Sequence, residues 1–165
     1  MILLDVNVLV HAFHEGAPDH PRYRAWLEGV VASPEPFAVS ELVLSGFVRV
    51  ATHPGIFDPP ATTVEALDFA SALRGQPNAV VVSPGARHWD LFVSLCTRAG
   101  ARGNLVPDAY LAALAIESGS EWITTDHDFS RFSALRWRHP LGAEAAPDAE
   151  ATPGGCSCRI VILWE

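Results

Sequence analysis

The sequence predicts an α/β fold with a parallel central sheet of about five strands and helices on both faces. Short apolar runs of strand length alternate with amphipathic segments of helix length, and Gly, Pro or polar residues separate them. Such alternation implies right-handed crossovers, which make the strands parallel and place helices on both faces of the sheet. A further observation is that acidic residues follow several of the apolar runs directly.

Five segments are predicted to be strands, because each is a short aliphatic or aromatic run bounded by polar or turn-forming residues. They are residues 2–4, 36–40, 79–83, 121–126 and 135–141. We expect the last of them to lie at an edge of the sheet.

Six segments between these strands have helical spacing. They are residues 6–13, 20–33, 40–53, 63–75, 88–100 and 108–119. Ser40 is expected to cap the third helix, and Pro107 suits the first turn of the last one, after a loop over 103–106. Cys96 lies in an apolar helical pattern and is expected to be buried.

The length of 165 residues suits one domain, which we assign to residues 1–141. Residues 142–165 begin with a small, acidic stretch rich in Pro, Gly and Ala, which reads as a linker, and end in an apolar run. That run is either disordered or an added edge strand. Cys156 and Cys158 lack the second pair of ligands that a zinc site needs, so they are interpreted as incidental thiols.

The start of the chain, MILLDVNVLVHAF, is apolar but has no basic segment, and Asp5 interrupts it. It is therefore interpreted as neither a signal peptide nor a membrane span, and the protein is expected in the cytoplasm, without membrane association.

The net charge of −8 argues against nucleic-acid binding, because contacts to phosphates require cations. Bound metal would neutralise several of the acids, however, so the net charge does not exclude nucleic-acid binding. All 11 basic residues are arginine, and the chain has no lysine. Any mechanism that requires a lysine is therefore excluded.

Four carboxylates, Asp5, Glu41, Asp108 and Asp126, lie beside apolar runs. A parallel sheet collects such residues at the carboxyl ends of its strands, where like charges repel unless a divalent cation holds them together. Hard oxygen ligands suit Mg²⁺ or Mn²⁺. Asp5, Asp108 and Asp126 are predicted metal ligands, and Glu41 is predicted to reach a metal-bound water or a second ion. Asp128 is a possible fifth acid.

Three further residues are candidates for substrate binding. Asn7 can donate a hydrogen bond to an acid or to a phosphate. Arg87 precedes a predicted helix and Arg102 precedes Asp108, so both are candidates for phosphate contacts, with solvated surface as the equally weighted alternative.

Other phosphate chemistries share parts of this pattern. Haloacid dehalogenase-type phosphohydrolases, receiver domains and P-loop proteins all use a lysine, which this chain lacks. The pattern therefore favours metal-dependent hydrolysis of a phosphodiester.

The segments LLDVNVLVHAF, SELVLSGFVRVATHP, GNLVPDAYLAALAIESG and WITTDHDFSRF resemble those of PIN-domain ribonucleases, and most resemble the VapC toxins of toxin–antitoxin modules. The resemblance covers about residues 1–140. It implies a three-layer α/β/α sandwich, Mg²⁺- or Mn²⁺-dependent cleavage of tRNA or rRNA that inhibits translation, a homodimer, and inhibition by a VapB-type antitoxin. It also implies that Asp5, Glu41, Asp108 and Asp126 form the catalytic site. Many relatives have Thr or Ser in place of Asn7.

Two alternatives stay open at this point. One is a PIN nuclease with a housekeeping role in RNA processing, and the other is a catalytically weak module whose acids bind a cation or a partner. If an antitoxin binds, we expect it to insert an arginine near Asp5, Glu41 and Asp108, because a guanidinium pairs well with carboxylates. Apolar helix faces that include Trp26 and Val48 are candidates for the dimer interface.

Overall fold

A computed structural model describes residues 1–142, and its centre is a five-stranded parallel sheet. The strand order is β3-β2-β1-β4-β5, and each neighbouring pair is parallel. The strands are β1 (Ile2–Leu4), β2 (Phe37–Val39), β3 (Ala79–Val81), β4 (Glu121–Ile123) and β5 (Trp137–Arg138). The predicted sheet is confirmed, including the edge position of the last strand.

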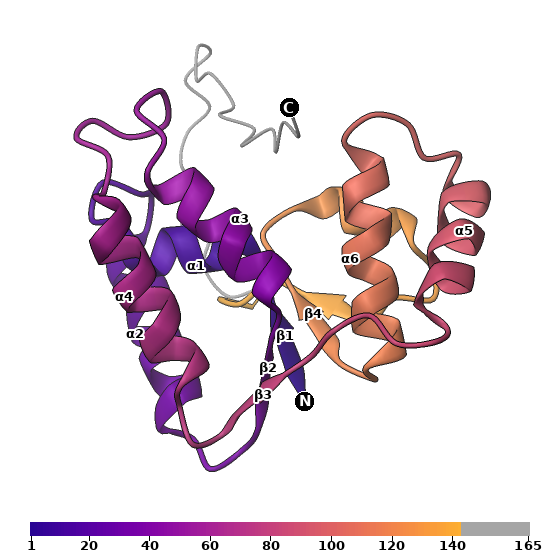
Figure 1. Ribbon diagram of the computed structural model, residues 1–165, viewed down its shortest axis with the longest axis horizontal. Helices are drawn as coiled ribbons and strands as arrows, with labels where there is room; N and C mark the ends of the chain where they lie inside the picture. The colour runs from indigo at the N-terminus through magenta and orange to yellow at the C-terminus, as the bar shows by residue number, and fades with distance from the viewer. Residues whose placement is uncertain (143–165) are drawn as a thin grey trace.

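Helices cover the sheet from two sides, and together they make the expected three-layer sandwich (Figure 1). On one side α1 packs against α2 and α3, and α3 packs against α4; on the other side α5 packs against α6. The helices are α1 (Val6–Phe13), α2 (His20–Ala32), α3 (Glu41–Ala51), α4 (Thr63–Arg74), α5 (His88–Ala99) and α6 (Leu105–Glu117). A 3₁₀ turn, η1 (His127–Arg131), follows β4.

The strand order places a topological switch point between β1 and β4. From β1 the chain moves outward to β2 and β3, and it then returns to the other side of β1 to form β4 and β5. Because the two directions put their crossover helices on opposite faces, the loops after β1 and β4 diverge and leave a crevice at their carboxyl ends. Ligands of open α/β sheets bind at such a point.

Local sequence explains several helix boundaries. Thr62 and Glu65 form a reciprocal capping box at the start of α4, with Glu65 N–H donating to Thr62 Oγ1 over 3.2 Å. Gly100 ends α5 in the left-handed region, at φ +59°, where glycine is favoured. Ser40 occupies the N-cap position of α3, as predicted, but its side chain makes no capping hydrogen bond.

The predicted start of α6 was wrong. Residues 103–106 were expected to form a loop, but the helix begins at Leu105, two residues before Pro107. Proline is tolerated here because the first-turn N–H groups of a helix have no intrahelical acceptor. The earlier start adds Leu105 to the buried core.

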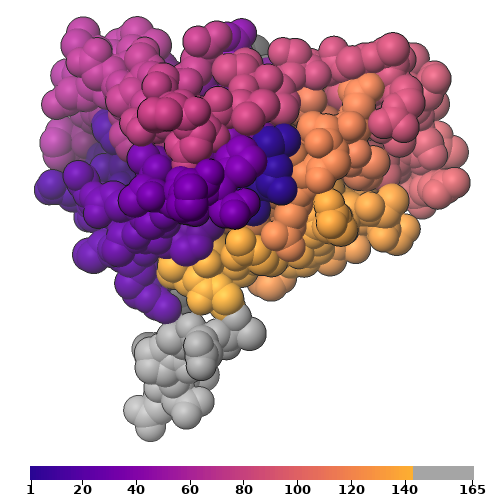
Figure 2. Space-filling view, turned by 90° about the horizontal axis from the view of Figure 1, so that it is seen from below, coloured from indigo at the N-terminus to yellow at the C-terminus, as the bar shows by residue number. Residues whose placement is uncertain are grey.

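The core lies on both faces of the central strands. Leu3, Phe37, Phe47 and Trp122 are among its largest fully buried side chains, whereas Val80 of the edge strand β3 is 41% exposed. At the surface, the N-terminal residues emerge between the purple-magenta and orange parts of the chain (Figure 2).

Two apolar residues of α5 are more exposed than the core residues around them. Cys96 was expected to be buried but is only half-buried. Trp89, another apolar residue of α5, is 64% exposed in the single chain. The predictions for the tail, including Cys156 and Cys158, lie outside the described residues.

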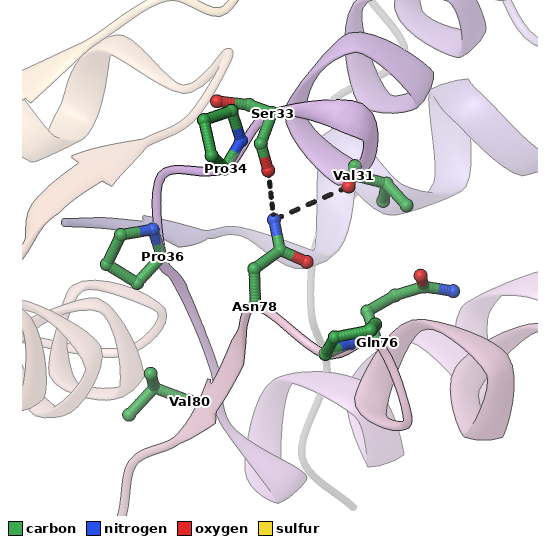
Figure 3. A pocket seen from close by; sticks show the side chains of 8 residues that line it. Val31, Ser33, Pro34, Pro36, Gln76, Asn78 and Val80 are labelled. Atoms are coloured by element: carbon green, nitrogen blue, oxygen red, sulfur yellow. Dashed lines mark hydrogen bonds between the residues drawn. The ribbon is translucent and has the colours of Figure 1, made fainter.

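A hollow of about 650 Å³ lies at the amino ends of β2 and β3, away from the strand ends that carry the acids (Figure 3). The Asn78 amide crosses it and donates to the carbonyl of Ser33 over 2.7 Å and to that of Val31 over 3.4 Å. Asn78 therefore ties the end of α2 to the start of β3. None of the residues that line the hollow is charged, and the hydroxyl of Ser33 accepts a hydrogen bond of 3.1 Å from the Glu35 N–H, so we assign this hollow a structural role.

Candidate active site

Asp5 is the most buried acid at the switch point. It follows β1 directly, caps α1, and is 3% exposed. The Val6 N–H donates to Asp5 Oδ1 over 2.6 Å, so one carboxylate oxygen is committed to the helix start. Burial raises the pKa of Asp5 to about 7, against the opposing effect of the Thr124 and Val6 hydrogen bonds, and the charge of Asp126 raises it further.

The second oxygen of Asp5 belongs to a polar network with Thr124 and Asn7. Thr124 Oγ1 donates to Asp5 Oδ2 over 2.6 Å, and Asn7 Nδ2 donates to the same oxygen over 2.9 Å. Asn7 Nδ2 also contacts Thr124 Oγ1 at 3.1 Å, and the Asp126 N–H donates to that hydroxyl over 3.0 Å. The network fixes the Asp5 carboxylate and joins the ends of β1 and β4. In this structure Asn7 therefore donates its hydrogen bond to an acid, Asp5, and helps to orient it.

Asp108 approaches the same crevice from the first turn of α6. Its pKa is raised to about 7, mainly by burial and then by the charges of Asp126, Asp5 and Asp128. Three carboxylates that raise the pKa of a fourth lie close enough to repel it through space. The fold thus brings together acids from β1, α6 and the loop after β4.

Asp126 and Asp128 occupy the loop that follows β4. Asp126 is exposed, and its Oδ1 accepts a hydrogen bond of 2.8 Å from the Asp128 N–H, which caps η1. Asp128 is half-buried and contributes to the charge around Asp108. Asp128, the possible fifth acid, therefore lies near Asp108 and belongs to the same group of acids.

Glu41 differs from the other acids, because it already has a cationic partner. Its Oε1 accepts hydrogen bonds from Arg74 Nε over 3.1 Å and from Arg74 Nη2 over 2.9 Å. Its side chain is 67% exposed, and that of Arg74 is 50% exposed. Glu41 does not contribute to the raised pKa of Asp5 or Asp108.

The two candidate arginines lie at opposite ends of α6. Arg102 is exposed in the loop before α6, and its carbonyl accepts from the Leu105 N–H, so it is at the end that carries Asp108. The Arg87 N–H donates to Glu117 Oε1 over 2.9 Å at the other end of the helix. Nine residues separate Glu117 from Asp108, or about 14 Å along the axis. The structure therefore brings Arg102 toward the acids and does not bring Arg87 there.

The donor chemistry of the site fits a hard divalent cation. Asp5, Asp108 and Asp126 supply carboxylate oxygens, and the raised pKa values of Asp5 and Asp108 show that the unneutralised charge is unfavourable. Within residues 1–142, no three His, Cys, Asp or Glu side chains are close enough to form a ready coordination group. Mg²⁺ commonly keeps several waters and uses only one or two carboxylates, so this spacing is compatible with it.

Sequence reasoning missed two residues of this region, Thr124 and Arg74. Thr124 is fully buried between Asp5 and Asp126, and its place directly after β4 was the signal that could have identified it. Arg74 carried no such signal, because the last turn of a helix commonly ends in a basic residue.

The described helices include none that is long and apolar enough to cross a bilayer.

Comparison with known proteins identifies the class to which this fold and site belong. The PIN domain family model matches residues 2–135. Among curated proteins, ribonuclease VapC43 of Mycobacterium tuberculosis is 40% identical over 144 residues, which cover 87% of this chain and 98% of that protein. Ribonuclease VapC25 of the same species is 39% identical over 140 residues, covering 85% and 99%.

A solved structure, VapBC2 from Rickettsia felis bound to a promoter DNA fragment, is similar in fold, with a TM-score of 0.62 and 19% identity. The alignment covers 84% of this chain and 98% of that one. The chain therefore belongs to the PIN-domain family, and within it to the group of VapC ribonucleases. The resemblance inferred from the sequence motifs is confirmed.

Proposed function

We propose that the protein is a metal-dependent endoribonuclease and the toxin component of a type II toxin–antitoxin system. The observation that carries the proposal is the group of Asp5, Asp108 and Asp126 at the switch point, where burial and the charges of neighbouring acids raise the pKa values of Asp5 and Asp108. Its similarity to VapC ribonucleases over most of the chain supports the substrate class.

Asp5, Asp108 and Asp126 would hold Mg²⁺ or Mn²⁺, one or two of them directly and the rest through water molecules bound to the ion. When bound, the ion would lower the pKa of a water and stabilise negative charge on a phosphodiester oxygen. Thr124 and Asn7 keep the Asp5 carboxylate in one orientation, so the donor set is arranged before substrate arrives. Arg102, at the same end of α6, is our candidate for contact with an RNA phosphate, and Arg87 would contact only a more distant part of a long substrate.

We further propose that a VapB-type antitoxin inhibits the protein by placing an arginine among the acids. The pair between Glu41 and Arg74 supports this idea, because one of the carboxylates predicted for the site already binds a guanidinium. A homodimer is also proposed. Trp26 and Val48 are half-buried against their own core, whereas Trp89 and Val93 of α5 are exposed apolar residues and better candidates for its interface.

The decisive experiment compares the wild type with Asp5→Asn, which keeps an oxygen for the Val6 N–H. Purified wild-type protein should cut total RNA in Mg²⁺ or Mn²⁺ and stop when EDTA is added. Asp5→Asn should be folded by circular dichroism and cleave at least about 100-fold more slowly. Asp68→Asn, an exposed acid on α4, serves as the matched control and should cut normally.

Induction in a bacterial host separates the toxin from an RNA-processing enzyme. The wild type and Asp68→Asn should arrest growth, and Asp5→Asn should not. Cleavage without arrest would favour the processing role. Failure of antitoxin-free protein to cut any cellular RNA would remove the nuclease proposal altogether.

A further inference from the structure

A groove of about 540 Å³ opens between α3 and the pair α5–α6. Leu42 lines it from α3, Phe92 from α5, and Asn104, Pro107, Tyr110 and Leu111 from α6 and the residue before it. The volume lies in the range of sites that hold small organic ligands. None of its lining side chains is charged, which suits an uncharged group better than a phosphate.

The groove adjoins the acidic site through two elements. Asn104, the N-cap residue of α6, lies four residues before Asp108, and Leu111 lies three residues after it, so the three share one face at helical spacing. Pro107 directly precedes Asp108, and Leu42 directly follows Glu41. A polymeric ligand that has one phosphate bound at the acidic site can therefore place the next group along its chain in the groove.

Neighbouring rings hold the Tyr110 side chain in place at the edge of the groove. The Tyr110 ring lies 4.2 Å from the His88 ring and 5.6 Å from the Phe92 ring, measured between centroids. His88 is 3% exposed, and its Nε2 lies 3.0 Å from the Tyr110 carbonyl. A ring held in this way is a stacking surface that costs little conformational entropy to use.

The groove also contains an uncommitted amide. Asn104 is the N-cap residue of α6, but its side chain makes no capping hydrogen bond and has no other partner among residues 1–142. An amide offers two donors and one acceptor, which match the mixed donors and acceptors on the edge of a nucleobase.

We propose that this groove binds the nucleobase of a nucleotide beside the scissile phosphate, with Tyr110 and Phe92 supplying the apolar surface and Asn104 reading the edge of the base. The proposal rests on the proposed function, since it assigns RNA as the ligand. It makes Tyr110 and Asn104 determinants of cleavage-site preference. A protein segment or a second copy of the chain is the competing occupant, but neither would require the free amide beside Asp108.

Binding can be measured without cleavage by using the full chain that carries Asp5→Asn. The probes are fluorescein-labelled eight-nucleotide RNAs of mixed sequence, each with one abasic residue at a different position, and the readout is fluorescence anisotropy in Mg²⁺. With the groove intact, one abasic position should weaken binding about 5- to 150-fold, the range expected for loss of one stacked base. In the Tyr110→Leu background, binding should be weaker overall and that position should have no further effect.

Leu67→Ala, an exposed apolar residue on α4, is the control and should preserve the abasic effect. In the cleaving protein, Asn104→Ala should change the base preference beside the cut, mapped by sequencing the new RNA ends, and should raise KM more than it lowers kcat. Abasic effects that are identical with and without Tyr110 would overturn the proposal even if the protein cuts RNA. An unchanged cut pattern combined with a shift from dimer to monomer by sedimentation would also overturn it, and would identify the groove as a protein interface.

Discussion

Asp5 and Glu41 follow adjacent strands of the same sheet, β1 and β2, yet the fold gives them opposite environments. Asp5 is buried and receives hydrogen bonds from Val6, Asn7 and Thr124, but no cation. Glu41 is exposed and already bound by Arg74. Acids that look alike in the sequence therefore divide into a group around the buried Asp5, whose members repel one another, and one residue that is paired with an arginine.

The largest expected effect concerns metal binding by the group of Asp5, Asp108 and Asp126. In the wild type, Mg²⁺ at about 100 times its dissociation constant should stabilise the fold by about 2.7 kcal/mol, which raises the melting temperature by about 5–10 °C. Asp5→Asn combined with Asp108→Asn should abolish that rise. Glu41→Gln should retain most of it, because Glu41 is outside the group. A rise that survives in the double variant would place the ion elsewhere.

The next effect concerns the network that holds Asp5. Thr124→Val removes the hydroxyl that donates to Asp5 and accepts from the Asp126 N–H. The free energy of unfolding should fall by about 1–3 kcal/mol, because buried polar groups lose their partners. RNA cleavage should fall about 10- to 100-fold, as for other groups that orient metal ligands. Denaturant titration and cleavage rates check this result, with the half-buried Thr125→Val as the control.

A pH dependence should follow from the raised pKa values of Asp5 and Asp108, both about 7 in the fold against 3.8 for a free side chain. Between these values the folded protein binds more protons than the unfolded chain, so its stability falls as the pH rises. Without metal, the wild type should lose about 10 °C in melting temperature from pH 5 to pH 8, relative to the double Asn variant, with the larger part coming from the more buried Asp5. Mg²⁺ at pH 8 should reverse this loss. If the melting temperatures of the wild type and the double Asn variant changed equally with pH, the raised pKa values of Asp5 and Asp108 would be contradicted.

The smallest effect concerns the internal partner of Glu41. Arg74→Gln should change stability by less than about 1 kcal/mol, since the ion pair is exposed. It should strengthen Mg²⁺ binding about 2- to 5-fold, because a competing cation leaves the rim of an acidic site. Arg24→Gln, which removes a similarly exposed pair with Glu28, is the matched control for calorimetric titration. Equal metal affinity in both variants would show that Glu41 and the bound ion are independent.

The sequence by itself determined the alternation of strands and helices, the positions of the acids and the family. These features depend on local periodicity and on motifs within one segment, such as the run that ends in Asp5, so they can be read along the chain. The residues at which helices begin and end were predicted less accurately. The early start of α6 depends on Leu105 reaching the core, which local pattern does not reveal.

Only the tertiary structure decided how the acids are used. The strand order creates the switch point between β1 and β4, and this brings Thr124 to Asp5 across 119 positions of sequence. Folding α4 against α3 brings Arg74 to Glu41 across 33 positions. Burial and charge pairing arise between segments that are distant in the chain. Residue type and spacing therefore did not distinguish a buried carboxylate such as Asp5 from one that is already paired with an arginine.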